Sequence, residues 1–187
     1  MKINEYFKVI YFFFFIIRKY TRIIISLILQ KIIITHQLFN SKLTNQNSTD
    51  NKNYVFFLYG GIGDHIMLKK LIDNLSLNHK ITIFLNYKFK FLDILFPNCE
   101  IEFYNKKKIF SLLKLRDNKY KNSVFLSWSS SIEILFIFLF SKCKYFMGVL
   151  GDHTKIFLYN KIIKTKKINR YELFNSYFFD ILNIKNI

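Results

Sequence analysis

The chain has 187 residues, of which 51% are hydrophobic and 19% aromatic. This composition excludes a disordered or fibrous protein and favours one domain with a sizeable core. The formal net charge of +17 is of the kind that attracts nucleic acids or anionic membranes, but we expect no nucleic-acid partner, because the aromatic residues fall in runs that read as buried.

The N-terminal segment, residues 1–39, is basic and strongly apolar. Its apolar runs, 9–17 and 23–29, are separated by three cations, Arg18, Lys19 and Arg22. Each run is shorter than the roughly 20 residues that cross a bilayer. One sector of a helical wheel holds Lys8, Lys19, Arg22, Ser26 and Gln30, which predicts a basic amphipathic helix in a membrane interface. A helix packed on the domain and a signal anchor are the alternatives. Residues 40–53 are polar and aperiodic and predict a linker to a domain at 54–187.

The segment YVFFLYGGIGD, residues 54–64, joins a strand to a helix through three glycines. Its first six residues are apolar on both faces, which predicts a fully buried strand. Gly60, Gly61 and Gly63 allow the backbone to turn sharply and a ligand to approach closely. Asp64 falls at the start of the helix, where the helix dipole favours its charge and the unpaired N–H groups suit an anionic ligand.

Strand-like and helix-like segments alternate through the rest of the chain. Apolar runs predict strands at 81–85, 100–104, 123–128 and 145–149. Helical periodicity predicts helices at 66–77, 87–96, 106–115, 129–140 and 169–182. This alternation predicts an α/β domain with a doubly wound, Rossmann-like parallel sheet. Ligands of such sheets bind beyond the carboxyl ends of the strands, which is where the glycine turn lies.

Several cofactor and metal sites are not expected. A dinucleotide site requires G-x-G-x-x-G and an acidic residue about 20 positions later, but Ile66 replaces the third glycine and the second strand is followed by Asn86. The sequence also has no Walker G-K-[ST], and it lacks metal-ligand spacing. Its two cysteines, Cys99 and Cys143, lie far apart and predict reduced core thiols in a cytosolic protein. We therefore expect no cofactor and no metal.

The glycine turn has another interpretation. The segment GGIGDHIM, residues 60–67, follows a buried strand and opens a helix, and in this setting it resembles the N-terminal domain of family 9 glycosyltransferases, the lipopolysaccharide heptosyltransferase-like enzymes. The order of elements agrees from residue 54 onward. It includes the serine-rich turn 129–131, the strand segment YFMG at 145–148 and the segment NRYE at 169–172 that opens the last predicted helix.

The resemblance implies the N-terminal half of a GT-B fold, in which two Rossmann-like domains face a cleft and the first binds the acceptor. It implies that Asp64 is the general base that takes a proton from the acceptor hydroxyl, in a metal-independent transfer. Inverting sugar transfer needs such a base within hydrogen-bond reach of the attacking hydroxyl; an aspartate that only caps a helix is the alternative. The residues we expect to contact the acceptor are Gly60, Gly61, Gly63, His65, Lys69, Ser129 and Ser130.

Each candidate has a plainer interpretation. His65 assists Asp64 or binds an acceptor phosphate, and its plainer interpretation is a side chain that faces solvent in the first helical turn. Lys69 stands where the family usually has a Thr-Thr-Pro-like segment, and a lysine there pairs with an acceptor phosphate or carboxylate. Ser129 and Ser130 bind sugar oxygens or belong to a turn that caps the following helix.

The expected function is sugar transfer from a nucleotide-sugar to a lipid-linked, lipopolysaccharide or other cell-surface glycan acceptor. The chain ends at Ile187, where the family's nucleotide-sugar-binding domain would begin, so we expect that domain to be missing or supplied by a separate chain. The N-terminal helix favours a cytoplasmic protein held peripherally on the inner face of the cytoplasmic membrane. The alternative is a catalytically incompetent fragment that binds a glycan or a partner protein.

Overall fold

The computed structural model describes residues 3–43, 53–105, 109–127, 131–150, 155–158 and 161–164. Its first part runs α1 (Ile3–Leu43), β1 (Tyr54–Leu58), α2 (Ile62–Ser76), β2 (Ile81–Asn86), η1 (Tyr87–Leu95) and β3 (Glu100–Tyr104). Its second part runs η2 (Ile109–Arg116), η3 (Asn118–Tyr120), β4 (Val124–Ser127), α3 (Ile132–Phe140), β5 (Tyr145–Leu150), β6 (Lys155–Leu158) and β7 (Lys161–Lys164). The helix expected at 169–182 lies outside these residues.

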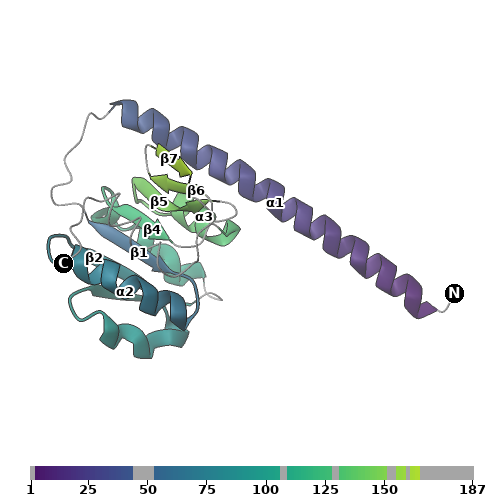
Figure 1. The fold of residues 1–187 in the computed structure, drawn as a ribbon, viewed down its shortest axis with the longest axis horizontal. Coiled ribbons are helices and arrows are strands. Elements are labelled where there is room, and N and C mark those ends of the chain that lie inside the picture. The colour runs from purple at the N-terminus through teal and green to yellow at the C-terminus, as the bar shows by residue number, and fades with distance from the viewer. Residues whose placement is uncertain are drawn as a thin grey trace.

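The sheet has the strand order β3-β2-β1-β4-β5-β6-β7. Strands β1 to β5 are parallel to one another, and β6 and β7 extend the sheet in antiparallel fashion. Helix α2 covers one face of the sheet, and α3 and α1 lie over the other (Figure 1). The predicted doubly wound, Rossmann-like α/β arrangement is therefore confirmed. The two short antiparallel strands were not predicted, because four-residue segments that begin with lysine carry a weak strand signal.

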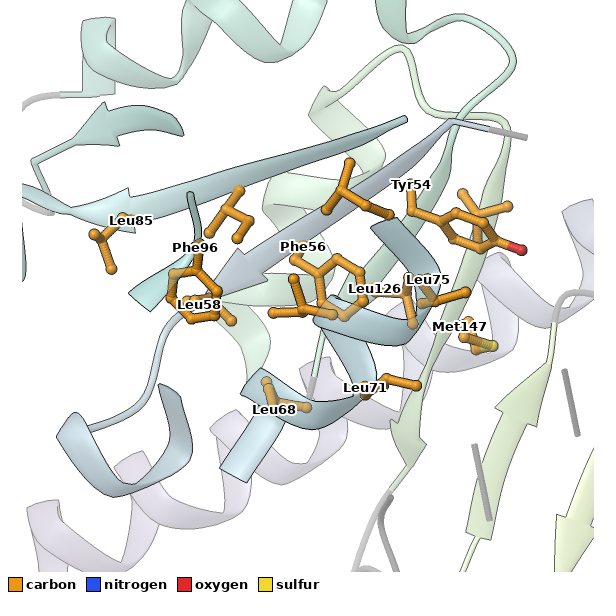
Figure 2. Close-up of a cluster of buried hydrophobic side chains, with 14 of the residues drawn as sticks. Tyr54, Phe56, Leu58, Leu68, Leu71, Leu75, Leu85, Phe96, Leu126 and Met147 are labelled. Carbon is orange, nitrogen blue, oxygen red and sulfur yellow. The ribbon is translucent and has the colours of Figure 1, made fainter. Parts of the chain in front are cut away.

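Alternate residues of β1 serve the two faces of the sheet. Tyr54, Phe56 and Leu58 pack with three leucines of α2, Leu68, Leu71 and Leu75, as Figure 2 shows. Val55 and Phe57 join the opposite cluster with side chains of α3 and α1. Because both faces are covered, every residue of β1 is buried, which is why the strand reads as a continuous apolar run.

The segment predicted as an α-helix at 87–96 forms the 3₁₀ element η1 instead. Its Phe89 has φ −110° and ψ 26°, a kink that divides the segment into short turns. The predicted helix at 106–115 is likewise 3₁₀ where the structure describes it, from Ile109 to Arg116. Hydrophobic periodicity does not distinguish such short turns from an α-helix, since both repeat about every three to four residues.

Helix α1 is 41 residues long, and it packs on the domain only through its C-terminal part. Leu29, Ile33 and Gln37, spaced four residues apart, are buried on one face of the helix. The backbone N–H of Phe146 donates to Gln37 Oε1 at 3.1 Å, and Gln37 Nε2 donates to the carbonyl of Lys144 at 3.3 Å. Strand β6 pairs with β5 only from Met147 onward. Gln37 thus accepts one hydrogen bond from the open edge of β5 and donates another to it just before that point.

The N-terminal part of α1 extends away from the domain (Figure 1). Its apolar side chains from Ile10 to Ile28 are mostly exposed, and Phe13 and Phe14 are 63% and 66% accessible to solvent. None of the described helices combines the length and the apolar character needed to cross a membrane. The helix continues to Leu43, so the first residues of the segment expected to be a linker are helical.

Candidate functional site

The glycine turn lies where the direction of the sheet's connections reverses. Strand β1 is followed by α2 on one face, whereas its neighbour β4 is followed by α3 on the other. In doubly wound sheets the carboxyl ends of two such strands border a crevice, which is the usual position of a ligand. The glycine turn therefore lies at the carboxyl ends of the strands, as the sequence predicted, and the fold explains why this end of the sheet is suited to binding.

Asp64 occupies the third position of α2, and its side chain caps the start of the helix as the acidic residue of a capping box does, although Gly61 has no side chain to return the bond. The backbone N–H of Gly61 donates to Asp64 Oδ2 at 2.8 Å, and the N–H of Asp64 donates to the carbonyl of Gly61 at 3.1 Å. A Cβ at Gly60 would lie 1.8 Å from Asp64 Oδ2, so only glycine fits there without displacing the carboxylate. A Cβ at Gly61 or Gly63 would meet nothing within 4 Å. The turn is thus tight on its inner side and open on its outer side.

The plainer interpretation of His65, a side chain that faces solvent, is wrong. The side chain is 0% exposed, its Nδ1 lies 2.5 Å from the carbonyl oxygen of Gly61, and its ring meets that of Phe89 edge to face at 5.3 Å. Position 65 falls on the inner face of α2, together with Leu68 and Ile72. His65 therefore holds the glycine turn from inside the domain and does not project into the crevice.

The other candidates are placed as follows. Lys69 forms an ion pair with Asp73 one turn further along α2. Ser129 and Ser130 lie outside the described residues. The adjacent Ser131 is the N-cap of α3, and its Oγ accepts a hydrogen bond from the N–H of Ile134 at 3.4 Å. Among the candidates that the structure describes, the three glycines and Asp64 lie together at the open turn.

A pocket of about 410 Å³, which sequence reasoning missed, lies on the face of the sheet opposite α2. It is lined by Tyr59, Tyr104, Leu112, Glu133, Phe136, Ile137 and Phe140. The four α3 residues in this set follow the spacing of one helical stripe. The two tyrosines stand at the carboxyl ends of β1 and β3. Their position at the ends of strands could have indicated a binding site from the sequence. The apolar sequence of α3, however, suggested only that this helix packs in the hydrophobic core.

Charges gather at one end of this pocket. Arg22 of α1 donates to Glu133 Oε1 at 2.6 Å. Burial alone raises the pKa of Glu133, but hydrogen bonds from its own backbone N–H and from Ser131, together with Arg22, outweigh this and leave the pKa lowered. Burial, followed by the negative charge of Glu133, raises the pKa of the Tyr59 hydroxyl. At neutral pH this end of the pocket therefore holds an ionised carboxylate, its arginine partner and a neutral phenol.

Of the two cysteines predicted to be core thiols, Cys143 is buried, whereas Cys99 is only half-buried at the edge of the core. Cys99 and Cys143 are both free, and burial raises the pKa of Cys99 to about 11 and that of Cys143 to about 12. Within the described residues, no group of three or more His, Cys, Asp or Glu side chains is placed to hold a metal ion.

Comparisons with protein-family models, with curated proteins and with solved structures find no match for this chain.

Proposed function

We propose that the protein is an acceptor-binding domain of glycosyltransferase type, which works at a membrane surface with Asp64 as general base. The observation that carries the proposal is the position of the Asp64 carboxylate. It stands beside an open glycine turn, at the carboxyl edge of a doubly wound sheet, where the strand order reverses. This is the place at which the fold class binds ligands.

The hydrogen-bond geometry of Asp64 is compatible with that role. One bond from the Gly61 N–H engages Oδ2 at 2.8 Å and fixes the orientation of the carboxylate. A carboxylate has about four lone-pair sites on its two oxygens, so capacity remains for an acceptor hydroxyl. Because Gly61 and Gly63 have open space on their outer side, a bulky sugar has room to approach the base.

The proposed donor is a nucleotide-sugar held by a second domain that faces this crevice. The proposed acceptor is a lipid-linked or cell-surface glycan such as lipopolysaccharide. The exposed apolar residues of α1 and its cations, Arg18, Lys19 and Arg22, support work at an anionic membrane interface. On this proposal the protein lies on the inner face of the cytoplasmic membrane.

A second candidate function is a binding module that holds a glycan or a partner protein without transferring sugar. The helix-capping bond of Asp64 favours it, because the bond from the Gly61 N–H accounts for this carboxylate without any chemistry. N-terminal capping of this kind contributes about 0.5–2 kcal/mol of stability.

Asp64→Asn separates the two functions. An asparagine oxygen still accepts the Gly61 N–H bond, so the cap survives while the base is lost. We expect the variant to lower the transfer of a radiolabelled sugar from nucleotide-sugars to a membrane extract by about 10²-fold or more. Asp73→Asn, which removes a carboxylate from the same helix but away from the turn, serves as the matched control. Equal transfer by wild type and Asp64→Asn would exclude the base. Glycan binding without transfer by wild type would identify the binding module.

The membrane interface has its own test. Replacing Phe13 and Phe14 by glutamate removes two exposed apolar side chains from the projecting part of α1. We expect co-sedimentation with phosphatidylcholine–phosphatidylglycerol vesicles to fall by about tenfold or more, because charged side chains are costly in the interface, while the urea midpoint of the domain stays the same. The control, Ile94→Glu, changes an 80% exposed residue of η1. Unchanged sedimentation of the double variant would show that α1 is not the membrane contact.

A further inference from the structure

The pocket beside α3 has the size and lining of a ligand site. Its volume of about 410 Å³ falls in the range of small-molecule pockets, roughly 300–1,000 Å³. One wall is the stripe Glu133, Phe136, Ile137 and Phe140, and Leu112 of η2 stands on another side. Phe136 and Phe140 are 52% and 37% exposed, so the pocket opens to the outside. From Glu133 to Phe140 the stripe is about 10 Å long, at about 1.5 Å of helix rise per residue.

The two ends of this stripe carry different charges. At one end Glu133 is already neutralised by Arg22. At the other end the guanidinium of Arg116 lies 5.2 Å from the centre of the Phe140 ring. Arg116 forms no ion pair with any carboxylate among the described residues, whereas its neighbour Lys114 is paired with Glu102. The pocket is therefore an apolar trough, and the cation over Phe140 at one end has no carboxylate partner within the described part of the chain.

We propose that this pocket binds an anionic amphiphile, with its aliphatic chain along the Phe136–Phe140 wall and its anionic head at Arg116. Apolar walls with a few placed polar groups are the usual recognition of such a ligand, and arginine is the side chain best suited to carboxylate and phosphate heads. The site uses neither Asp64 nor the glycine turn, so it stands independently of the proposed sugar transfer.

A ligand with an aliphatic chain and an anionic head can come from two sources, a membrane lipid or a free amphiphile in solution. The projecting part of α1 begins beside this pocket, since Arg22 of α1 pairs with Glu133 in the pocket wall. A lipid at the surface contacted by α1 would thus lie near the pocket opening. A free fatty acid or alkyl phosphate satisfies the same contacts from solution.

The test measures binding of 11-(dansylamino)undecanoic acid to the full-length chain, below the critical micelle concentration of the probe. Phe136→Glu places a carboxylate in the pocket wall, and we expect it to weaken binding by about tenfold or more, since a charge is costly next to an aliphatic chain. Leu139→Glu adds the same charge to the same helix at a 40% exposed position that does not line the pocket. This control should retain the wild-type affinity.

A second pair of variants tests the anionic head. Arg116→Gln should weaken binding of the acid several-fold and leave binding of its neutral methyl ester unchanged, because only the acid gains from the guanidinium. Lys114→Gln, which removes one cation from the same element, should change neither. Equal effects of Phe136→Glu and Leu139→Glu, or an equal loss of acid and ester with Arg116→Gln, would overturn the proposal.

Photo-crosslinking then identifies the source. The full-length chain is bound to phosphatidylcholine vesicles that contain phosphatidylglycerol with a diazirine in one acyl chain. Crosslinks to α3 would identify a membrane lipid as the ligand. Crosslinks confined to α1, together with tight binding of the dansyl acid, would identify a free amphiphile. Asp64→Asn should bind the dansyl acid normally, so that failure of the transfer proposal leaves this result intact.

Discussion

Gln37 joins α1 to the edge of the sheet through two hydrogen bonds, and Gln37→Leu tests how much these bonds contribute to stability. The substitution keeps the approximate size of the side chain and removes both of its hydrogen bonds. The N–H of Phe146 and the carbonyl of Lys144 then lose the partners that they have at 3.1 and 3.3 Å. Both groups lie under α1, where Gln37 itself is only 2% exposed, so water does not readily replace the lost bonds.

The cost follows from the two groups that are left unsatisfied. An unpaired buried backbone group costs about 1–3 kcal/mol. The Phe146 N–H is fully buried and contributes most, while the longer bond to the partly buried Lys144 carbonyl contributes less. We expect Gln37→Leu to lower the free energy of unfolding by about 2–3 kcal/mol. With a typical urea m-value, this corresponds to a fall in the midpoint of about 1 M or more.

Urea unfolding and amide hydrogen exchange measure the effect. Gln30→Leu is the matched control, because Gln30 lies on the same helix and, within the described part of the chain, bonds only Ser26 one turn away, at 3.1 Å. We expect the control to cost about 0.5 kcal/mol or less. The Phe146 amide should lose protection in Gln37→Leu alone. If the two variants unfold alike and that amide stays protected in both, α1 is not anchored through Gln37.

Two further predictions concern the glycine turn and a surface ion pair. Gly60→Ala should destabilise the protein by about 0.5–2 kcal/mol, because the added methyl group displaces the capping carboxylate. Gly63→Ala should stabilise it by about 0.5–1 kcal/mol, because a Cβ at that position meets nothing within 4 Å. If thermal unfolding showed that both variants shift the melting temperature in the same direction, the geometry of the turn would be contradicted. The hydrogen bond from Lys119 lowers the pKa of Glu100, so the stability from this pair is present above the ordinary carboxyl pKa and is lost as the pH falls through the lowered value. In Lys119→Met an NMR titration should move the Glu100 midpoint upward, and an unmoved midpoint would rule out Lys119 as the cause.

The local pattern of the sequence was enough to predict the parallel core of the fold. Strand β1 is buried on both faces, and its apolar run shows this directly. The glycines and Asp64 marked the passage from β1 to α2, because a sharp turn and a helix start require these residue types. The 3₁₀ form of η1 and the short strands β6 and β7 escaped prediction, since brief elements carry little periodicity.

What only the tertiary structure decided is which side chains meet. Nothing near Gln37 in the sequence indicates that its partners stand more than 100 residues away, one in β5 and one just before it. His65 follows Asp64 directly, yet the helical turn of about 100° per residue carries it to the buried face of α2. The pocket is formed by β1, β3, η2 and α3 together, and its lining residues become neighbours only when the sheet and α3 pack. Periodicity along one element predicts which face is apolar, whereas a site between elements depends on contacts that no single segment encodes.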